Sequence, residues 1–109
     1  MDEKKIQELQ LLEQNLQNTL LQKQAFQLEL SETQAALKEI EKSGDEVFKI
    51  IGNLMIKTEK TKMQEELENK KKILELRMKT LEKQETELSK DSEKIREELI
   101  KSANKDKKS

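Results

Sequence analysis

The chain has 109 residues, of which 41% are charged, 32% are hydrophobic and only 2% are aromatic, and its formal net charge is −1. So little bulky apolar area cannot offset the conformational entropy of a globular core, which leaves long helices, a coiled coil or disorder. The balanced charge and the absence of proline favour a long helix or coiled coil over disorder, and the lack of a basic surplus argues against nucleic-acid binding.

The chain contains neither cysteine nor histidine. This removes the usual zinc and thiol chemistry and the commonest general base, and a two-helix coil offers no water-excluding pocket with converging polar groups. We therefore expect no enzyme activity, no metal and no cofactor. No apolar run approaches the roughly 18 residues that a membrane span needs, and the first ten residues lack the apolar core of a signal peptide, so we expect a cytoplasmic protein.

The first predicted element is a helix over about residues 4–42. Its apolar residues alternate at the three- and four-residue spacing of a heptad, with Thr19, Lys23 and Thr33 in the remaining core positions. This interrupted stripe favours a coiled coil over a helix of a globular core. Ser43-Gly44 should end the helix, with the glycine in the left-handed conformation after the last turn. The apolar positions are Leu9, Leu12, Leu16, Phe26, Leu30, Leu37 and Ile40.

The next segment, residues 47–57 with the sequence VFKIIGNLMIK, interrupts the helical pattern with branched apolar residues of high strand propensity. In its middle, Gly52-Asn53 has glycine first, as a two-residue type II′ turn prefers. We therefore predict a β-hairpin over about residues 46–58, with Ile51 opposite Leu54.

Both faces of this predicted hairpin are mostly apolar. A lone two-stranded hairpin is marginal in water, and one that is apolar on both faces is prone to aggregate. No other strand is predicted in the chain, so we expect strands of other chains to cover it. A simpler interpretation stays open, in which the segment is further helix or an apolar loop packed on the coil. The predicted oligomerisation residues are Val47, Phe48, Ile50, Ile51, Gly52, Leu54, Met55 and Ile56.

The second predicted helix covers about residues 61–102. One apolar seam repeats every seven residues without a break, whereas the companion seam mixes apolar and polar residues, which favours a two-stranded coil. The two helices have similar lengths, so an antiparallel pair would bring the start of the first near the end of the second. The last residues, about 103–109, should form a disordered basic tail. The unbroken seam holds Leu67, Leu74, Leu81, Leu88 and Ile95, and the companion seam holds Lys71, Met78, Glu85, Ser92 and Leu99.

The order of these elements resembles the beta-type subunits of the prefoldin family. The specific similarity lies in Phe48-Lys49 and Gly52 of the hairpin, with branched residues after the glycine. The segments QKQAFQLELSETQAALKEIEK, residues 22–42, and LELRMKTLEKQE, residues 74–85, are similar to that family as well. Alpha-type subunits carry two hairpins between their helices, whereas the short span here leaves room for one.

This resemblance implies a single prefoldin-like domain over residues 1–109. It implies a hexamer of two alpha-type and four beta-type subunits, whose hairpins build a double β-barrel from which six coiled coils extend. It further implies an ATP-independent chaperone that binds unfolded proteins at the tips of the coils and passes them to a group II chaperonin, without nucleotide or cofactor. The main alternative is a generic coiled-coil adaptor that oligomerises through its hairpin.

Client binding is expected where the two helix ends meet, because the ends of a two-stranded coil fray and leave apolar side chains partly exposed. Several weak contacts of this kind add up without sequence specificity, which suits non-native chains. The same residues could instead simply close the last turns of the coil. The predicted client-binding residues are Ile6, Leu9, Leu12, Ile95, Leu99 and Ile100.

Overall fold

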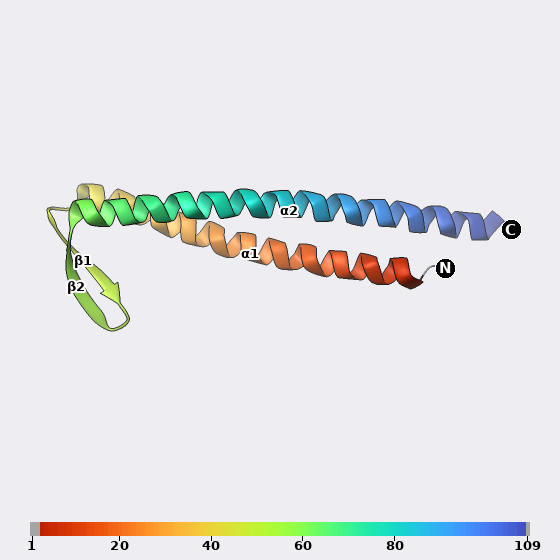
Figure 1. The fold of residues 1–109 in the computed structure, drawn as a ribbon, viewed down its shortest axis with the longest axis horizontal. Helices are drawn as coiled ribbons and strands as arrows, with labels where there is room; N and C mark the ends of the chain where they lie inside the picture. The colour runs from red at the N-terminus through yellow and green to blue at the C-terminus, as the bar shows by residue number, and fades with distance from the viewer. Residues whose placement is uncertain (1–2, 109) are drawn as a thin grey trace. The chain divides into compact units, whose positions relative to one another are not determined.

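The computed structural model describes residues 3–108, with side chains for residues 3–104. The chain divides into two compact units. Residues 25–78 form the hairpin unit, and residues 1–24 together with 79–109 form the terminal unit. The predicted architecture, mainly α with an antiparallel helix pair and one β-hairpin between the helices, is confirmed (Figure 1). The elements are α1 (Glu3–Lys42), β1 (Glu46–Ile51), β2 (Leu54–Glu59) and α2 (Lys60–Lys108).

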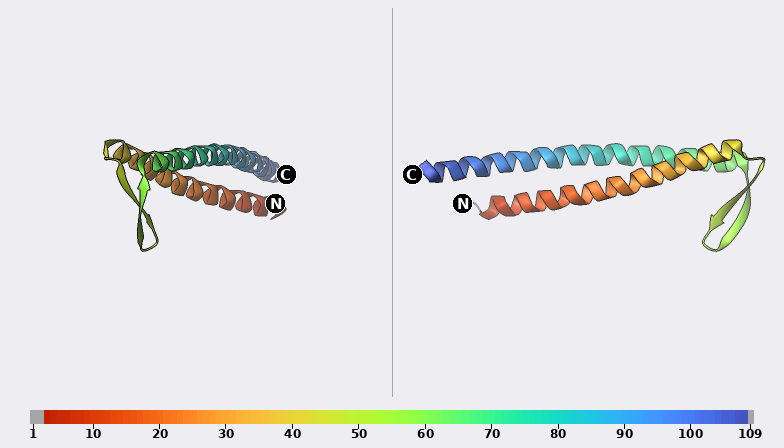
Figure 2. Two further views of the ribbon diagram at one scale, coloured as in Figure 1. Left: turned by 60° about the vertical axis from the view of Figure 1, so that its left-hand side comes forward. Right: turned by 180° about the vertical axis from the view of Figure 1, so that it is seen from behind.

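In the terminal unit, α1 and α2 lie side by side and run antiparallel (Figures 1 and 2). The predicted seam positions are the ones withdrawn from solvent, with Thr19 of α1 and Leu81 and Ser92 of α2 buried. The Thr19 hydroxyl donates a hydrogen bond to the backbone carbonyl of Asn15 at 2.9 Å, so its burial leaves no unmet donor. The polar residues in the heptad pattern therefore occupy the seam, as the spacing indicates.

In the hairpin unit, the same seam continues and the hairpin projects to one side of the helices (Figures 1 and 2). Leu74 and Met78 of α2 are buried, and Thr33 of α1 is buried as well. The guanidinium of Arg77 lies 5.5 Å from the ring centroid of Phe26, a cation–π contact between the two helices. Apolar packing and one stacked arginine thus hold this part of the coil.

The end of α1 corrects one prediction. Gly44 does not take the left-handed conformation, since Gly52 is the only residue with positive φ in the described chain. Instead, the Ser43 hydroxyl donates to the carbonyl of Ile40 at 2.8 Å, and the ammonium of Lys60 donates to the carbonyl of Ser43 at 2.9 Å. The hydroxyl thus satisfies one carbonyl of the last turn, and the cation lies at the negative end of the helix, where it also reaches the carbonyl of Glu41 at 3.4 Å.

The boundaries of α2 also differ from the prediction. The helix begins at Lys60, directly after β2, and continues to Lys108, so the expected disordered tail is helical up to that residue. The reason is visible in the sequence, because no proline or glycine follows Gly52 to stop the helix. Residue 109 of the expected tail lies outside the described residues. Neither helix contains, over the described residues, an apolar stretch of the kind that crosses a bilayer.

Candidate functional site

The hairpin pairs its strands in the predicted register. β1 and β2 are antiparallel, with Ile51 opposite Leu54 across the turn. Gly52 has a φ of 59°, whereas Asn53 does not have a positive φ. Positive φ at the first turn residue only is the pattern of a type II′ turn, which the sequence predicts. The turn decides which side chains share a face, because a shift of one residue would exchange the two faces.

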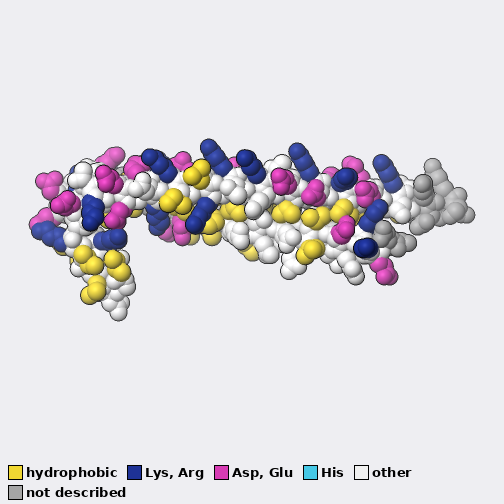
Figure 3. Space-filling view, viewed as in Figure 1, with side chains coloured by type: hydrophobic (Ala, Val, Ile, Leu, Met, Phe, Trp, Pro, Cys, Tyr) yellow, Lys and Arg dark blue, Asp and Glu magenta, His cyan; other side chains and the backbone are white. Residues whose placement is uncertain are grey.

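The hairpin exposes apolar side chains on both faces. Figure 3 shows the apolar side chains on the side of the hairpin that faces the viewer. We call Ile51, Leu54 and Ile56 the outer face, and Phe48, Ile50 and Met55 the coil-side face. By the strand register, Val47 and Lys49 at the base of the hairpin lie on the same side of the sheet as the outer face. All six side chains are exposed, up to 71% for Ile50 and 67% for Leu54. An exposed apolar patch of this kind is typical of a protein–protein interaction surface and is uncommon on a protein that functions as a monomer.

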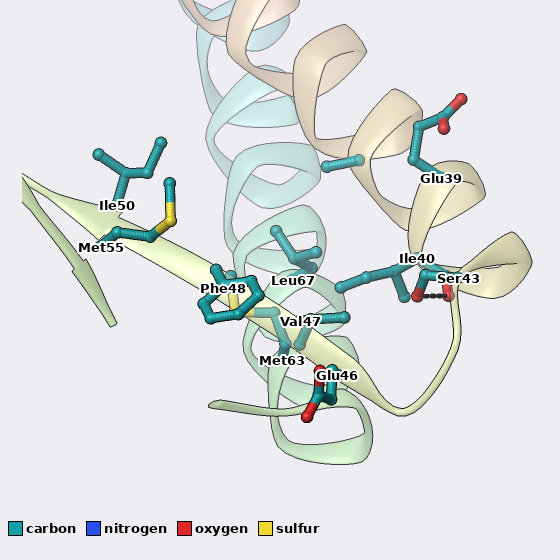
Figure 4. A pocket seen from close by; sticks show the side chains of 11 residues that line it. Glu39, Ile40, Ser43, Glu46, Val47, Phe48, Ile50, Met55, Met63 and Leu67 are labelled. Atoms are coloured by element: carbon teal, nitrogen blue, oxygen red, sulfur yellow. Dashed lines mark hydrogen bonds between the residues drawn. The ribbon is translucent and has the colours of Figure 1, made fainter. Parts of the chain in front are cut away.

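Val47 is the exception among the predicted oligomerisation residues. Its side chain is only 8% exposed. It points toward Ile40 of α1 and lies beside Met63 and Leu67 of α2 (Figure 4). Val47 therefore anchors the first strand on the helices of its own chain, while the rest of the hairpin remains uncovered.

Ion pairs link the hairpin to its surroundings within the hairpin unit. The ammonium of Lys49 in β1 lies 2.9 Å from a carboxylate oxygen of Glu66 in α2, and Lys57 pairs with Glu46 across the strands at 2.9 Å. Such exposed pairs contribute little to stability, typically about 0–1 kcal/mol. Their role is geometric, because Lys49 joins the strand to the helix at a defined point.

An apolar groove opens between the coil-side face and the helices (Figure 4). Its volume is about 580 Å³. Ile40 and Leu67 form part of its helical wall, and Phe48 forms part of its hairpin wall. The sequence did not predict this groove, because a heptad pattern and a strand pattern do not give the angle between the hairpin and the coil.

The predicted client-binding residues all lie in the terminal unit. Two ion pairs bring the beginning of α1 close to the C-terminal part of α2, namely Lys5–Glu98 at 3.3 Å and Arg96–Glu13 at 2.6 Å. Of the six side chains, Ile100 is 60% exposed. The other five are half-buried along the seam, and they are Ile6, Leu9, Leu12, Ile95 and Leu99.

Two further leucines of the terminal unit are exposed, and the sequence analysis did not single them out. Both residues belong to α1. Leu11 directly precedes Leu12, which lies in the seam, and Leu21 directly follows Leu20, which lies beside it. The doublets Leu11-Leu12 and Leu20-Leu21 carried the signal, because a helix cannot turn two adjacent side chains toward the same partner. Apolar surface is therefore available on this unit outside the seam.

The ion pairs of the terminal unit also affect ionisation. The hydrogen bond from Arg96 to Glu13 raises the pKa of the arginine, and the hydrogen bond from Lys23 to Glu85 raises the pKa of the lysine. In both pairs the carboxylate favours the charged form of the cation. No group of three or more acidic side chains within the described part of the chain is placed to hold a metal ion.

The sequence model of the family described as "Prefoldin subunit" matches residues 3–106, which extend over both units. The chain belongs to the prefoldin family. This membership, together with the uncovered hairpin, favours a prefoldin subunit over a generic coiled-coil adaptor.

Two similar relatives are named as prefoldin subunits of the beta type. The prefoldin subunit beta of Thermococcus onnurineus is 45% identical over 92 residues, which are 83% of this chain and 77% of the relative. The prefoldin subunit beta of Pyrobaculum calidifontis is 42% identical over 88 residues, which are 79% of this chain and 70% of that protein. The similarity therefore covers most of both partners in each comparison.

A solved prefoldin structure has the same fold. The crystal structure of the prefoldin beta subunit from Thermococcus strain KS-1 superposes with a TM-score of 0.82 at 37% sequence identity. The match covers 90% of this chain and 88% of that chain. The pair of helices joined by one hairpin is thus the prefoldin beta fold.

Proposed function

We propose that this prefoldin chain is a beta-type subunit of an ATP-independent chaperone in the cytoplasm. In this proposal, four copies assemble with two alpha-type subunits through their hairpins, which together form a β-barrel. The helices bind unfolded polypeptides and pass them to a group II chaperonin. Its relatives of known name are prefoldin beta subunits, which supports the assignment to the beta type.

The observation that carries the proposal is the uncovered hairpin. Six apolar side chains, three on each face, are exposed. Burying them against a partner would lower the free energy by roughly 25 cal/mol for each Å² of apolar surface removed from water. The hairpin has two strands only, and neither edge is paired within the described chain. Strands of other subunits would cover both the faces and the edges, as a barrel does.

Client binding is assigned to the terminal unit. The half-buried residues of the seam and the exposed Ile100 offer apolar area that an unfolded segment can share. Each contact is weak, but several subunits in one complex would act on the same client, and their combined affinity exceeds that of any single contact. No step of this cycle requires nucleotide.

The decisive experiment mixes the purified chain with an alpha-type prefoldin subunit. Native mass spectrometry should show a species of six chains with two alpha-type and four beta-type subunits. Light scattering of a chemically unfolded client, without nucleotide, should show suppressed aggregation by that species. A chain that stays apart from the alpha-type subunit, or a hexamer that leaves client aggregation unchanged, would refute the proposed function.

A further inference from the structure

The two helices of the terminal unit present different chemistry to solvent. Over residues 11–24, α1 has only two charged residues, Glu13 and Lys23. Both form ion pairs with side chains of α2, at 2.6 Å and 2.9 Å respectively. The other exposed side chains of this stretch are amides and leucines, whereas α2 is densely charged over residues 82–97 (Figure 3). The outward surface of this part of α1 is therefore neutral, in a chain of which 41% is charged.

A groove of about 400 Å³ lies between α1 and α2 of the terminal unit. We call it the amide groove, because four of its eight lining side chains are amides. The others are Thr19 and Leu88, which belong to the seam, and two carboxylates of α2. The amides are Asn15, Asn18 and Gln22 of α1 and Gln84 of α2, and the carboxylates are Glu87 and Asp91.

The four amides are available to a partner. The Thr19 hydroxyl donates to the backbone carbonyl of Asn15, and no side-chain amide of the groove makes a hydrogen bond within the described residues. A side-chain amide both donates and accepts. A polypeptide backbone has the same pattern, with an N–H donor and a C=O acceptor at every residue except proline. A backbone that is not already paired in a helix or sheet can therefore bind along these amides.

Two exposed leucines of α1 lie next to the amide groove. Leu11 lies four positions before Asn15, and Leu21 lies three positions after Asn18, so each is the surface neighbour of a groove residue. The two leucines are 59% and 56% exposed. The helix rises about 15 Å from Leu11 to Leu21, a distance that an extended segment of about five residues covers. Such a segment can place apolar side chains on both leucines while its backbone lies along the amides.

We propose that the amide groove binds an extended segment of an unfolded polypeptide through its backbone, with Leu11 and Leu21 contacting apolar side chains of that segment. The inference rests on the proposed chaperone function and adds to it where and how a client is bound. Recognition of the backbone gives binding without sequence specificity, because all clients share that backbone. The groove acts together with the seam residues near the helix ends, since weak contacts to one client multiply, so loss of either set should reduce protection.

Size and charge favour a short client segment over another folded subunit. The groove and the two leucines together present ten side chains, whereas a stable protein–protein interface uses about 20–30 residues on each side. Among the described side chains that line the groove, only Glu87 and Asp91 are charged. They repel acidic segments and accept neutral or basic ones. The expected occupant is an extended, mainly apolar segment without acidic residues.

Amides on different sides of α1 allow a matched test. Replacing three of them by alanine favours the helix in either set, so both variants should keep their helical circular dichroism. In hexamers assembled with the alpha-type subunit, the groove variant should bind a fluorescent peptide of leucine, serine and lysine at least about tenfold more weakly, which corresponds to about 1.4 kcal/mol. The control variant should bind it as the wild type does. The groove set is Asn15, Asn18 and Gln22, and the control set, exposed on the same helix outside the groove, is Gln10, Gln17 and Gln24.

Recognition of the backbone is tested by changing the peptide. N-methylation of alternate peptide bonds removes backbone donors and keeps every side chain, so the methylated peptide should bind the wild-type hexamer more weakly. The groove variant should lose less affinity on methylation than the wild type, because its partner groups are already gone. Equal affinity of the wild-type hexamer for both peptides would overturn recognition of the backbone.

A photo-crosslinking residue at Asn18 identifies the occupant in the hexamer, with the same residue at the neighbouring Gln17, outside the groove, as the control. In the presence of a chemically unfolded client, position 18 should crosslink to the client far more than position 17. Crosslinks from position 18 only to another prefoldin subunit would overturn the inference, as would unchanged peptide binding by the groove variant. In either case a wild-type hexamer that protects clients would leave the proposed function standing, whereas one that leaves client aggregation unchanged would refute both.

Discussion

Lys23 of α1 and Glu85 of α2 meet within the seam of the terminal unit, with the ammonium nitrogen 2.9 Å from a carboxylate oxygen. Both side chains occupy positions where a heptad calls for apolar residues. The hydrogen bond to Glu85 raises the pKa of Lys23. The sequence placed each residue in the seam separately, and the structure shows that they neutralise one another there.

The first prediction concerns the stability of this pair. Replacing Glu85 alone by leucine should lower the melting temperature slightly, because the partly exposed ammonium of Lys23 then stays charged in the seam with only the more distant carboxylate of Glu82 to favour it. Replacing both residues by leucine should raise the melting temperature above that of the wild type, because apolar seam residues need no desolvation of charge. Thermal unfolding followed by circular dichroism at neutral pH measures both variants. A double variant that melts below the Glu85→Leu chain would contradict this account.

The second prediction concerns pH. The pKa of Lys23 is higher in the folded chain than the ordinary lysine value of about 10.4, so folding favours the protonated lysine. The stabilisation is therefore fully present below that ordinary value and is lost as the pH rises through the raised pKa. The difference in melting temperature between the wild type and Glu85→Leu should be constant at neutral pH and shrink in strongly alkaline buffer. A difference that stays the same there would show that charge is not its origin.

The third prediction concerns the outer face. Ile51→Lys combined with Ile56→Lys should prevent formation of the six-chain complex while the helices remain folded, because two charges would enter an apolar interface. Ile73→Lys combined with Leu76→Lys is the matched control, since these residues of α2 are also exposed and the added charge is the same. Native mass spectrometry and circular dichroism report assembly and helix content. Full assembly of the Ile51/Ile56 variant would remove the outer face from the interface.

The fourth prediction concerns the turn. Gly52 holds a φ of 59°, which a β-branched residue adopts only at a cost of about 1–3 kcal/mol. No heavy atom lies within 4 Å of the position that a side chain at Gly52 would take, so backbone strain rather than collision is the expected cause. Gly52→Val should weaken assembly with the alpha-type subunit far more than Asn53→Ala, as measured by titration and native mass. Equal effects of the two changes would mean that the turn does not limit assembly.

The fifth prediction concerns client binding. Deleting residues 1–12 and 95–109 should leave the hexamer intact, because the hairpin unit keeps all its residues, and should abolish the suppression of client aggregation. Ile100→Ser tests the exposed residue alone and should weaken protection partially, with Ile73→Ser as the control for loss of one exposed isoleucine. Light scattering at matched hexamer concentration is the assay. Undiminished protection by the truncated hexamer would move client binding to the rest of the coil or to the barrel.

Local patterns in the sequence predicted the elements because their causes are local. The heptad gave the seam, including polar Thr19 and Thr33, and Gly52-Asn53 gave both the turn type and the strand register. The family resemblance, carried by the hairpin residues, agrees with the family match over residues 3–106.

The features that the sequence did not predict depend on side chains from separate elements. Lys60 of α2 donates hydrogen bonds at the C-terminal end of α1, on the other side of the hairpin in the sequence. The apolar groove depends on the angle between the hairpin and the helices. The pairing of Lys23 with Glu85 required the alignment of two distant segments. The structure places the predicted client-binding residues, but their role stays a prediction.

The threonines of the seam have a consequence for how the coil opens. Thr19 and Thr33 donate their hydroxyl hydrogen bonds to carbonyls of their own helix, four residues earlier, at 2.9 Å and 2.8 Å. These bonds stay intact when the two helices separate, so local opening leaves neither threonine hydroxyl without an acceptor. The Ser92 hydroxyl has no hydrogen-bond partner in the closed coil, and opening lets it bind water. Around these layers the helices can part briefly at little enthalpic cost. Each helix then loses the packing that supports its own backbone hydrogen bonds, so these bonds open more often and the backbone amides around Thr19 should exchange with deuterium faster than those beside Leu74 and Met78.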